Sequence, residues 1–230
     1  MSRLESLLDA LQRFYGAVPS LPRDPFALFV REVLSVQAAP HRRDAAFASL
    51  KRVPALTPDA MWKAPPKKLE ESVRLAGPYT ERRLAALRTG VEFFRRRPDL
   101  ASRIRGPLLS ARRALNGLPR MGDDGAHRML LFAADHAVLP AEGRMGRVIL
   151  RLGFGKKEAT PSRTARSIRD DVARDVPPGT PDAVAVYRRA FLYLDHHAVS
   201  TCTESEPHCH VCPVRDECPS SATRRGGGAS

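Results

Sequence analysis

Apolar residues recur about every three to four positions through most of the chain, which is the spacing of one face of an α-helix. In the first segment this pattern places Leu4, Leu7, Leu8, Leu11 and Phe14 on one face. The strand-like alternation of apolar and polar residues is missing from the sequence, so the pattern predicts an all-α protein. Further helices are expected at residues 26–36, 82–94, 110–118, 125–136, 160–176 and 181–199.

Two of the expected helix starts carry a capping side chain followed by proline. Asp24-Pro25 precedes the apolar run 26–36, and Thr57-Pro58 precedes another helix. An Asp or Thr at this position accepts a hydrogen bond from a first-turn N–H group, and proline fits the first turn because it has no N–H group to satisfy. Both dipeptides therefore predict where a helix begins.

The length of 230 residues suits one large domain or two small ones. Apolar residues make up 43% of the chain, which is enough for a core that we expect to include Trp62. The segment 1–13 has no long apolar run, so we expect no secretory leader and no membrane span. We expect the protein to be cytoplasmic and monomeric. The small and polar residues 219–230 are expected to be a disordered tail.

The charge of the chain favours a polyanionic partner. The formal net charge is +13 and the isoelectric point is about 10.4. Arginine and lysine pairs are spread over separate segments, which is typical of a folded nucleic-acid-binding face rather than of a basic arm. These clusters are Lys67-Lys68, Arg82-Arg83, Arg95-Arg96-Arg97 and Arg112-Arg113. A solvated basic surface without a partner is the alternative interpretation.

The four cysteines of the chain lie together near its end, at Cys202, Cys209, Cys212 and Cys218. A cytosolic chain keeps its thiols reduced, so two disulfides are not expected. Four thiolates this close together predict a metal site. Only the middle pair has the two-residue spacing of a zinc knuckle, and an iron–sulfur cubane also takes four thiolates. The spacing alone leaves zinc and iron–sulfur open.

A second signal lies in the expected helical pair at about residues 110–134. Apolar positions at Leu115, Leu118 and Met121 precede Gly122, and Ala126 opens an apolar helix. Such a turn lets the N-terminus of a helix present N–H groups to an anion, and phosphate is the anion expected on a basic protein. An ordinary helix pair with a glycine in its turn explains the same pattern.

These features resemble endonuclease III and its relatives, the helix-hairpin-helix (HhH-GPD) DNA glycosylases. The cysteine spacing after His197-Ala198 resembles the iron–sulfur loop of the family, and residues 118–126 resemble its hairpin sequence Leu-Pro-Gly-Val-Gly-x-Lys-Thr-Ala. Four hairpin residues match, namely Leu118, Pro119, Gly122 and Ala126. Arg120 replaces the first hairpin glycine, and Asp124 takes the place of the catalytic lysine. If the position of Arg120 needs a positive φ, the substitution costs backbone freedom.

The segment 141–148 resembles the stretch of the family that carries its catalytic aspartate, and Glu142 takes that place. The separation between Asp124 and Glu142 equals the separation of the two catalytic residues in the family. Upstream, Gln37 matches the glutamine that fills the gap left by a flipped base, and Pro78-Tyr79 matches the turn that wedges into the duplex. The resemblance implies these DNA-contact residues: Gln37, Pro78, Tyr79, Arg120, Met121, Gly122, Gly125 and Arg147.

The resemblance implies a two-lobed fold with a DNA cleft between the lobes. Residues 1–19 and 137–218 would form the iron–sulfur domain, in which all four cysteines hold a structural [4Fe-4S] cluster, and 20–136 would form a helical barrel domain. The implied function is base-excision repair of damaged double-stranded DNA, with an oxidised pyrimidine as the expected base. A prokaryotic protein of this kind would be associated with the nucleoid.

Asp124 and Glu142 stand where the family has its catalytic lysine and aspartate, and these two substitutions limit the reactions that the resemblance implies. The side chain of Asp124 has no amine group, so we expect no Schiff base and no strand cleavage by the route of the family. Glu142 is the expected catalytic carboxylate, and Asp124 is expected to raise the pKa of one of the two carboxyl groups. The alternatives are a catalytically inactive DNA-binding protein that recognises lesions or DNA shape, and a zinc-stabilised basic interaction protein.

Overall fold

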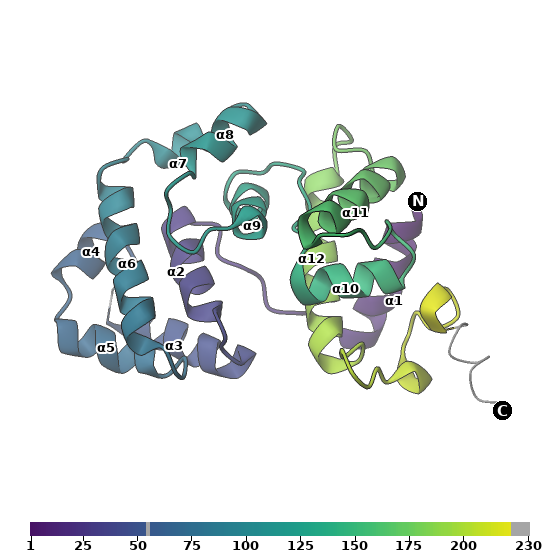
Figure 1. Ribbon diagram of the computed structural model, residues 1–230, viewed down its shortest axis with the longest axis horizontal. Coiled ribbons are helices and arrows are strands. Elements are labelled where there is room, and N and C mark those ends of the chain that lie inside the picture. Colours follow the sequence, from purple (N-terminus) through teal and green to yellow (C-terminus); the bar gives the residue numbers. More distant parts are fainter. Residues whose placement is uncertain (54–55, 222–230) are drawn as a thin grey trace. The chain divides into compact units, whose positions relative to one another are not determined.

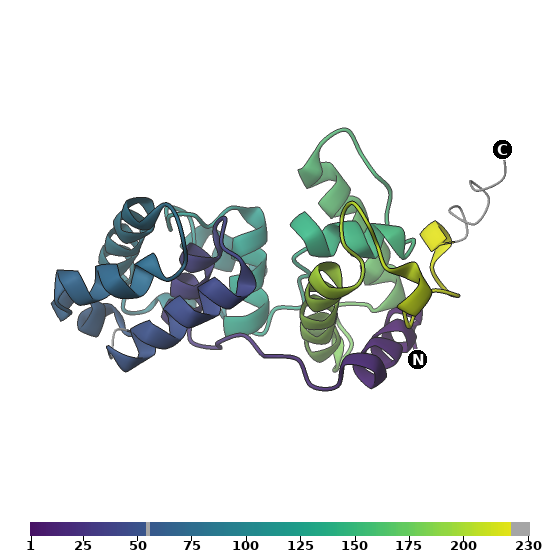
Figure 2. The same cartoon turned by 90° about the horizontal axis from the view of Figure 1, so that it is seen from below.

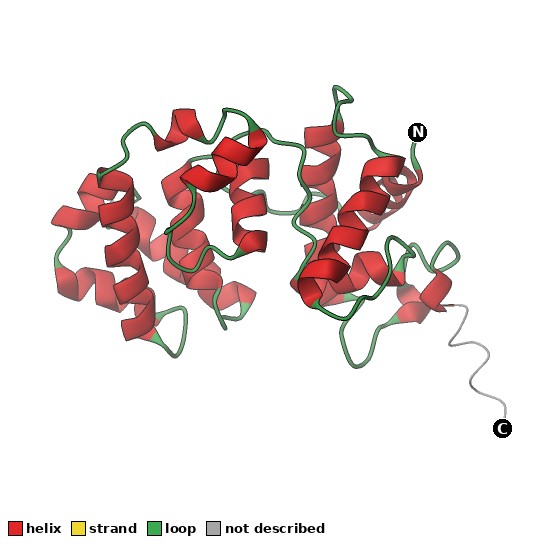
Figure 3. Ribbon diagram, turned by 45° about the horizontal axis from the view of Figure 1, so that its top comes forward, coloured by secondary structure: helices red, strands yellow, loops and turns green. Residues whose placement is uncertain are grey.

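The computed structural model describes residues 1–53 and 56–221, and within these residues the chain is helical and contains no strand (Figure 3). The all-α prediction is confirmed. The chain divides into two compact units, one formed by Met1–Ser20 with Ala137–Ser230 and the other by Leu21–His136. Among the described helices, none combines the length and the apolar character that crossing a bilayer requires.

The unit Leu21–His136 contains helices α2 to α9 (Figure 1). Their bounds are α2 Pro25–Ser35, α3 Pro40–Arg52, α4 Pro58–Lys63, α5 Pro66–Arg74, α6 Thr80–Arg95, α7 Leu100–Arg103, α8 Leu108–Ala114 and α9 Asp123–Ala133. Helix α2 packs against α3, α6 and α9 and is therefore the central element of this unit. The predicted caps are confirmed, because the side chains of Asp24 and Thr57 accept hydrogen bonds from Ala27 N and Ala60 N.

An aromatic cluster fills the core between α2 and α6. Phe26, Phe29, Phe93 and Phe94 have ring centroids about 5 to 6 Å from their neighbours, and all four are buried. Burial of one such side chain contributes about 1.5–3 kcal/mol. At Gly90 a Cβ atom would lie 2.1 Å from the Phe29 ring, so only glycine lets α6 approach α2 this closely.

The other unit contains α1 Arg3–Tyr15, α10 Gly143–Arg151, α11 Pro161–Asp175, α12 Ala183–Ser200 and the short helix η1 Cys209–Val211. Helix α12 packs against α1 and α10, so segments from both ends of the chain lie side by side (Figure 2). The four leucines of the predicted α1 face, Leu4, Leu7, Leu8 and Leu11, are fully buried. The Asp175 carboxylate accepts hydrogen bonds from Arg3 N at 3.1 Å and Leu4 N at 2.7 Å, which fixes the start of α1 on the end of α11.

Three expectations differ from the structure. Phe14 and Trp62 are 51% and 53% exposed, so neither belongs to the core. The Arg95 guanidinium instead lies over the Trp62 ring, with its Cζ atom 4.7 Å from the ring centroid. Pro219–Ser221 are helical and Ser221 is buried, so disorder was the wrong expectation for these three residues. The rest of the expected tail, 222–230, lies outside the described residues.

Candidate metal centre and nucleic-acid interface

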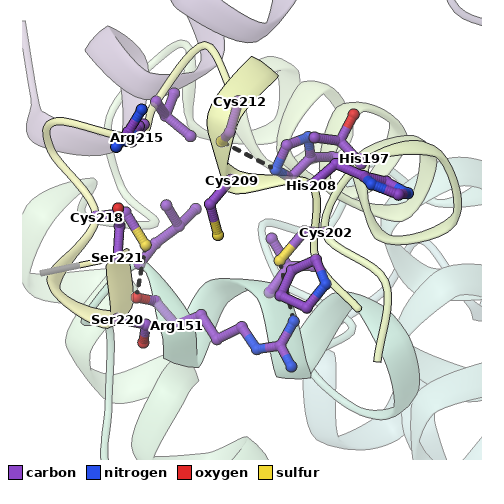
Figure 4. A pocket seen from close by; sticks show the side chains of 15 residues that line it. Arg151, His197, Cys202, His208, Cys209, Cys212, Arg215, Cys218, Ser220 and Ser221 are labelled. Atoms are coloured by element: carbon purple, nitrogen blue, oxygen red, sulfur yellow. Dashed lines mark hydrogen bonds between the residues drawn. The ribbon is translucent and has the colours of Figure 1, made fainter. Parts of the chain in front are cut away.

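All four cysteines line one pocket next to α10 and the end of α12 (Figure 4). They are free thiols, and all four border a common cavity of about 40 Å³. In the described part of the chain, no three His, Cys, Asp or Glu side chains come close enough together to hold a single metal ion. The thiols therefore surround a space rather than a point.

The start of the cysteine loop is anchored to helices α10 and α12. Cys202 N donates to His197 O at 2.7 Å, and the Arg147 guanidinium donates to the Cys202 carbonyl. Arg151 donates to Cys202 Sγ at 3.3 Å and to Thr203 O at 2.7 Å. At the far end of the loop, Cys218 Sγ lies 3.2 Å from Arg151 O. Both ends of the loop are thus attached to a single turn of α10.

Two groups of this pocket, Cys212 and His197, are held in their neutral forms. Burial raises the pKa of Cys212 to about 11, so a bare thiol here keeps its proton at pH 7. Burial, with the nearby His196 and Arg147, lowers the pKa of His197 to about 4. His197 Nδ1 lies 2.6 Å from the Tyr15 hydroxyl and Nε2 lies 3.7 Å from Cys212 Sγ, as expected of a packing and hydrogen-bonding residue. Four thiols around one pocket are a donor set that fits a metal centre, and a bound metal would displace their protons.

The hairpin segment consists of α8, a turn and α9, with Gly122 at the N-cap of α9. Arg120 has a φ of 62°, so the position does require the left-handed conformation that glycine adopts more easily. Met121 and Gly122 lie in the turn. Gly125 is buried in the first turn of α9, where a Cβ atom would lie 2.8 Å from the Met121 sulfur and would require that flexible side chain to move.

Asp124 belongs to a largely buried ion network. Arg128 donates to the Asp124 carboxylate and, through Nε at 2.9 Å and Nη2 at 2.7 Å, to both oxygens of Glu32. The network joins α2 to the first turns of α9. Burial alone would lower the pKa of Arg128, but Glu32 and Asp124 outweigh it and raise this pKa, so the guanidinium stays charged. Asp123, the other acid of the first turn, pairs with Arg112 at 3.1 Å.

Glu142 is the N-cap residue of α10 and lies in the other unit from Asp124. It borders a wide hollow of about 800 Å³, whose basic lining residues are Arg147, Arg151 and Lys157. The backbone here permits little change, because a Cβ atom at Gly146 would lie 2.2 Å from Ala141 O. Arg147, an expected DNA contact, donates to the carbonyls of Cys202 and Ala198, so its hydrogen bonds support the cysteine loop.

Three of the expected DNA-contact residues border one small pocket, namely Gln37, Tyr79 and Arg120. They come from the turn after α2, the turn before α6 and the hairpin. Val33, Val36, Arg82 and Arg83 complete its lining, which contains no Asp or Glu. Pro78 is exposed beside Tyr79. A pocket with three guanidinium groups and no carboxylate attracts anions such as phosphate.

The sequence analysis missed the residues that position these groups. Arg83 was expected on a basic face but is only 2% exposed. Glu32 and Arg128 carried no local signal, because their partners lie 96 residues apart in the sequence. A charged residue on the apolar face of α2 was the available clue for Glu32.

Comparison with known proteins places the fold. No protein-family model matches the sequence, and no curated protein does either. Solved structures match nearly the whole chain. A non-covalent complex of endonuclease III with DNA has a TM-score of 0.72 at 18% identity, covering 97% of both chains. A thermostable thymine-DNA glycosylase has a TM-score of 0.68 at 16% identity, covering 96% of this chain and 95% of that one.

A third structure, an H. pylori 3-methyladenine DNA glycosylase bound to 1,N6-ethenoadenine, has a TM-score of 0.63 at 14% identity. It covers 85% of this chain and 94% of its own. The neighbours act on different bases, so what they share is the architecture. The chain therefore has the fold of the helix-hairpin-helix DNA glycosylases, of which endonuclease III is one.

Proposed function

We propose that this protein is a base-excision-repair DNA N-glycosylase that removes a damaged base without cleaving the strand. The observation that carries the proposal is the match to glycosylase structures over 97% of both chains. The net charge of +13 and the pocket of Gln37, Tyr79 and Arg120 support binding to duplex phosphates. An oxidised pyrimidine is the base that we propose first, on the resemblance of the sequence motifs to those of endonuclease III.

Glu142 is the carboxylate that we assign to the chemistry. Hydrolysis of the N-glycosidic bond needs a carboxylate that stabilises a cationic sugar and orients water. Glu142 borders a hollow with several cationic side chains and is the N-cap residue of α10. Asp124 takes no part in this step, because its carboxylate is paired with Arg128. An aspartate carries no amine, so we propose that Schiff-base chemistry is absent at this position.

The four cysteines are the proposed ligands of a [4Fe-4S] cluster. The support is their donor chemistry, their position around one cavity, and the resemblance of their spacing to the iron–sulfur loop of endonuclease III. When bound, the cluster would cross-link the loop after α12. Iron and sulfide analysis of anaerobically purified protein tests this assignment. Four iron atoms per chain support it, and stoichiometric zinc without iron refutes it.

The activity is tested by single-turnover assays on duplexes that carry oxidised pyrimidines, uracil, alkylated bases or mismatches, with alkali to reveal abasic sites. Glu142→Gln should lower the rate about 100-fold or more, with the DNA affinity unchanged. Glu158→Gln is the matched control, because Glu158 borders the same hollow from the loop before α11 and should leave the rate unchanged. Equal rates for both variants would exclude Glu142 from the chemistry.

A second function is favoured by the ion network at Asp124, which replaces a catalytic group with a structural one. The alternative is a DNA-binding protein that recognises damaged or distorted duplexes without chemistry. The same substrate panel separates the two. Selective binding without cleavage of any substrate supports the binding protein, and cleavage of one substrate supports the glycosylase.

A further inference from the structure

Arg83 is a buried cation whose described hydrogen-bond partners are all main-chain carbonyl groups. It lies on α6 and is 2% exposed. Its guanidinium donates to Val36 O at 2.7 Å, to Gly77 O at 3.1 Å and to Pro78 O. Burial lowers the pKa of Arg83, yet an arginine keeps its proton at any physiological pH. A charge buried without a carboxylate is costly, and these three hydrogen bonds to the two turns offset part of that cost.

Two of the three carbonyl groups directly precede strained residues. Val36 precedes Gln37, whose φ is 49°, and Pro78 precedes Tyr79, whose φ is 71°. The φ angle of a residue sets the direction of the carbonyl group before it. A hydrogen bond that fixes the carbonyl of Val36 therefore holds φ at Gln37, and the bond to Pro78 does the same at Tyr79. Strained residues persist only where their surroundings determine them, and Arg83 supplies these surroundings for both.

The strained residues gather at one place. Among the described residues, the non-glycine positions with positive φ are Gln37, Tyr79, Arg120 and Asp135. The first three border the pocket that Arg83 also lines, while Asp135 follows α9. Gln37, Tyr79 and Arg120 are exposed, so their side chains are available to a partner although their backbone is held from beneath. Strain of this kind clusters at binding sites, where it fixes groups before the ligand arrives.

We propose that Arg83 is a positioning residue that joins the turn after α2 to the turn before α6 and holds Gln37 and Tyr79 ready for a distorted DNA duplex. The proposal rests on the proposed function in so far as DNA is the ligand. Arg83 itself does not reach the DNA, because its guanidinium is buried. It acts by removing the cost of ordering two turns at the moment of binding.

The neighbouring Arg82 provides a matched control. It is exposed, and its guanidinium lies over the Tyr79 ring, 5.4 Å from the centroid. Arg82→Met and Arg83→Met remove the same charge from almost the same place. Loss of a surface charge weakens binding to every duplex and fades as salt rises, because it reports counterion release. Loss of a positioning residue weakens binding to the distorted duplex in particular, and salt does not remove the effect.

The experiment measures fluorescence anisotropy with an intact duplex and with a duplex that carries an abasic-site analogue, each at low and at moderate salt. Arg83→Met should weaken binding to the abasic-site duplex about tenfold at both salt concentrations, which corresponds to about 1.4 kcal/mol. Arg82→Met should weaken binding to both duplexes alike, mainly at low salt. Equal behaviour of the two variants would overturn the proposal.

Backbone NMR of the DNA-free protein gives a second measurement that does not depend on the proposed function. Arg83→Met should shift the backbone signals of Gln37 and Tyr79 toward negative φ, whereas Arg82→Met, which removes a contact with the Tyr79 ring, should leave φ positive at both residues. The wild-type spectra alone also test the proposal. If either Gln37 or Tyr79 has a negative φ in the wild-type protein, the proposal is refuted even if neither variant folds. If the wild-type protein ignores both duplexes while Arg83→Met moves both signals, then the positioning role stands and the DNA-binding function fails.

Arg83→Lys separates geometry from charge. A lysine keeps the positive charge, but its single nitrogen cannot reproduce the planar fork that reaches carbonyl groups in two turns. It should behave like Arg83→Met in the anisotropy and NMR experiments. Full recovery of binding and of the signals with lysine would show that the charge alone matters.

Discussion

The ion network of Glu32, Arg128 and Asp124 makes a sharp prediction about stability. Arg128→Met removes the guanidinium and keeps most of the side-chain volume, so it leaves two carboxylates that face each other. The side chains of Glu32, Arg128 and Asp124 are 10%, 21% and 16% exposed, which places the network close to the fully buried case. Loss of one partner of a buried ion pair costs about 3–5 kcal/mol, and the partial exposure favours about 3 kcal/mol.

The cost should depend on pH in the direction opposite to ordinary acid unfolding. Without Arg128, burial and mutual repulsion raise the pKa of Glu32 and Asp124 in the folded state above their unfolded values. A group with a raised folded pKa contributes its full stability below its unfolded pKa and loses it as the pH rises through the folded value. The difference between the wild type and Arg128→Met should thus be largest near pH 7 and become smaller toward pH 4.

Trp62 gives a direct assay, because it is the single tryptophan of the chain and lies in the same unit as the network. Urea unfolding followed by its fluorescence should show a loss of about 3 kcal/mol at pH 7, and the melting temperature should fall by about 6–12 °C. Arg112→Met is the control, because Arg112 and Asp123 form an exposed pair that is worth at most about 1 kcal/mol.

A further variant isolates the cause. When Arg128→Met is combined with Glu32→Gln and Asp124→Asn, the uncompensated charges disappear and most of the lost stability should return. The reasoning is refuted if Arg128→Met stays within about 1 kcal/mol of the wild type at pH 7. It is equally refuted if the loss is the same at pH 7 and pH 4.

Three other predictions address the backbone and the chemistry. Arg120→Gly should raise the free energy of unfolding by about 1 kcal/mol, because glycine adopts a φ of 62° without steric cost; a loss of stability in urea unfolding would show that the arginine side chain contributes more than the strain removes. Gly146→Ala should destabilise the protein by more than 2 kcal/mol, since its Cβ atom would meet Ala141 O at 2.2 Å, and thermal unfolding followed by circular dichroism measures this loss. Asp124→Lys should give no covalent adduct with abasic DNA on borohydride treatment, because Arg128 repels a second cation; a strong adduct would contradict this account.

The helices that the sequence predicted correctly are those marked by residues within the helix itself or directly before it. Asp24 and Thr57 are N-cap residues whose side chains bind N–H groups three residues later, and the leucines of α1 repeat without interruption. Helix α3 was missed because its buried positions include Arg43, which hides the apolar period. Helix α10 was missed because Gly143 and Gly146 lower its helix propensity, and tertiary contacts overcome that cost.

The sequence predicted that the four cysteines gather at one place, and the structure has them around one pocket, while their metal stays a prediction. The cysteines could be found from spacing, because thiols close together have few other uses. The role of Asp124 could not, because its partner Arg128 is held in turn by Glu32 on a distant segment. Arg82 and Arg83 look alike in the sequence, and only the packing of α6 places one outside and the other inside.

The packing of α1 against α12 has a consequence for biosynthesis. The residues of the unit Leu21–His136 leave the ribosome together, so this unit can fold while translation continues. Helix α1 precedes this unit, but its partner helices α11 and α12 emerge only late, so the buried leucines of α1 stay open to chaperones for most of synthesis. The cysteines follow α12 in the sequence, so their pocket is completed last. Until then the apolar face of α1 lacks the helices against which it packs.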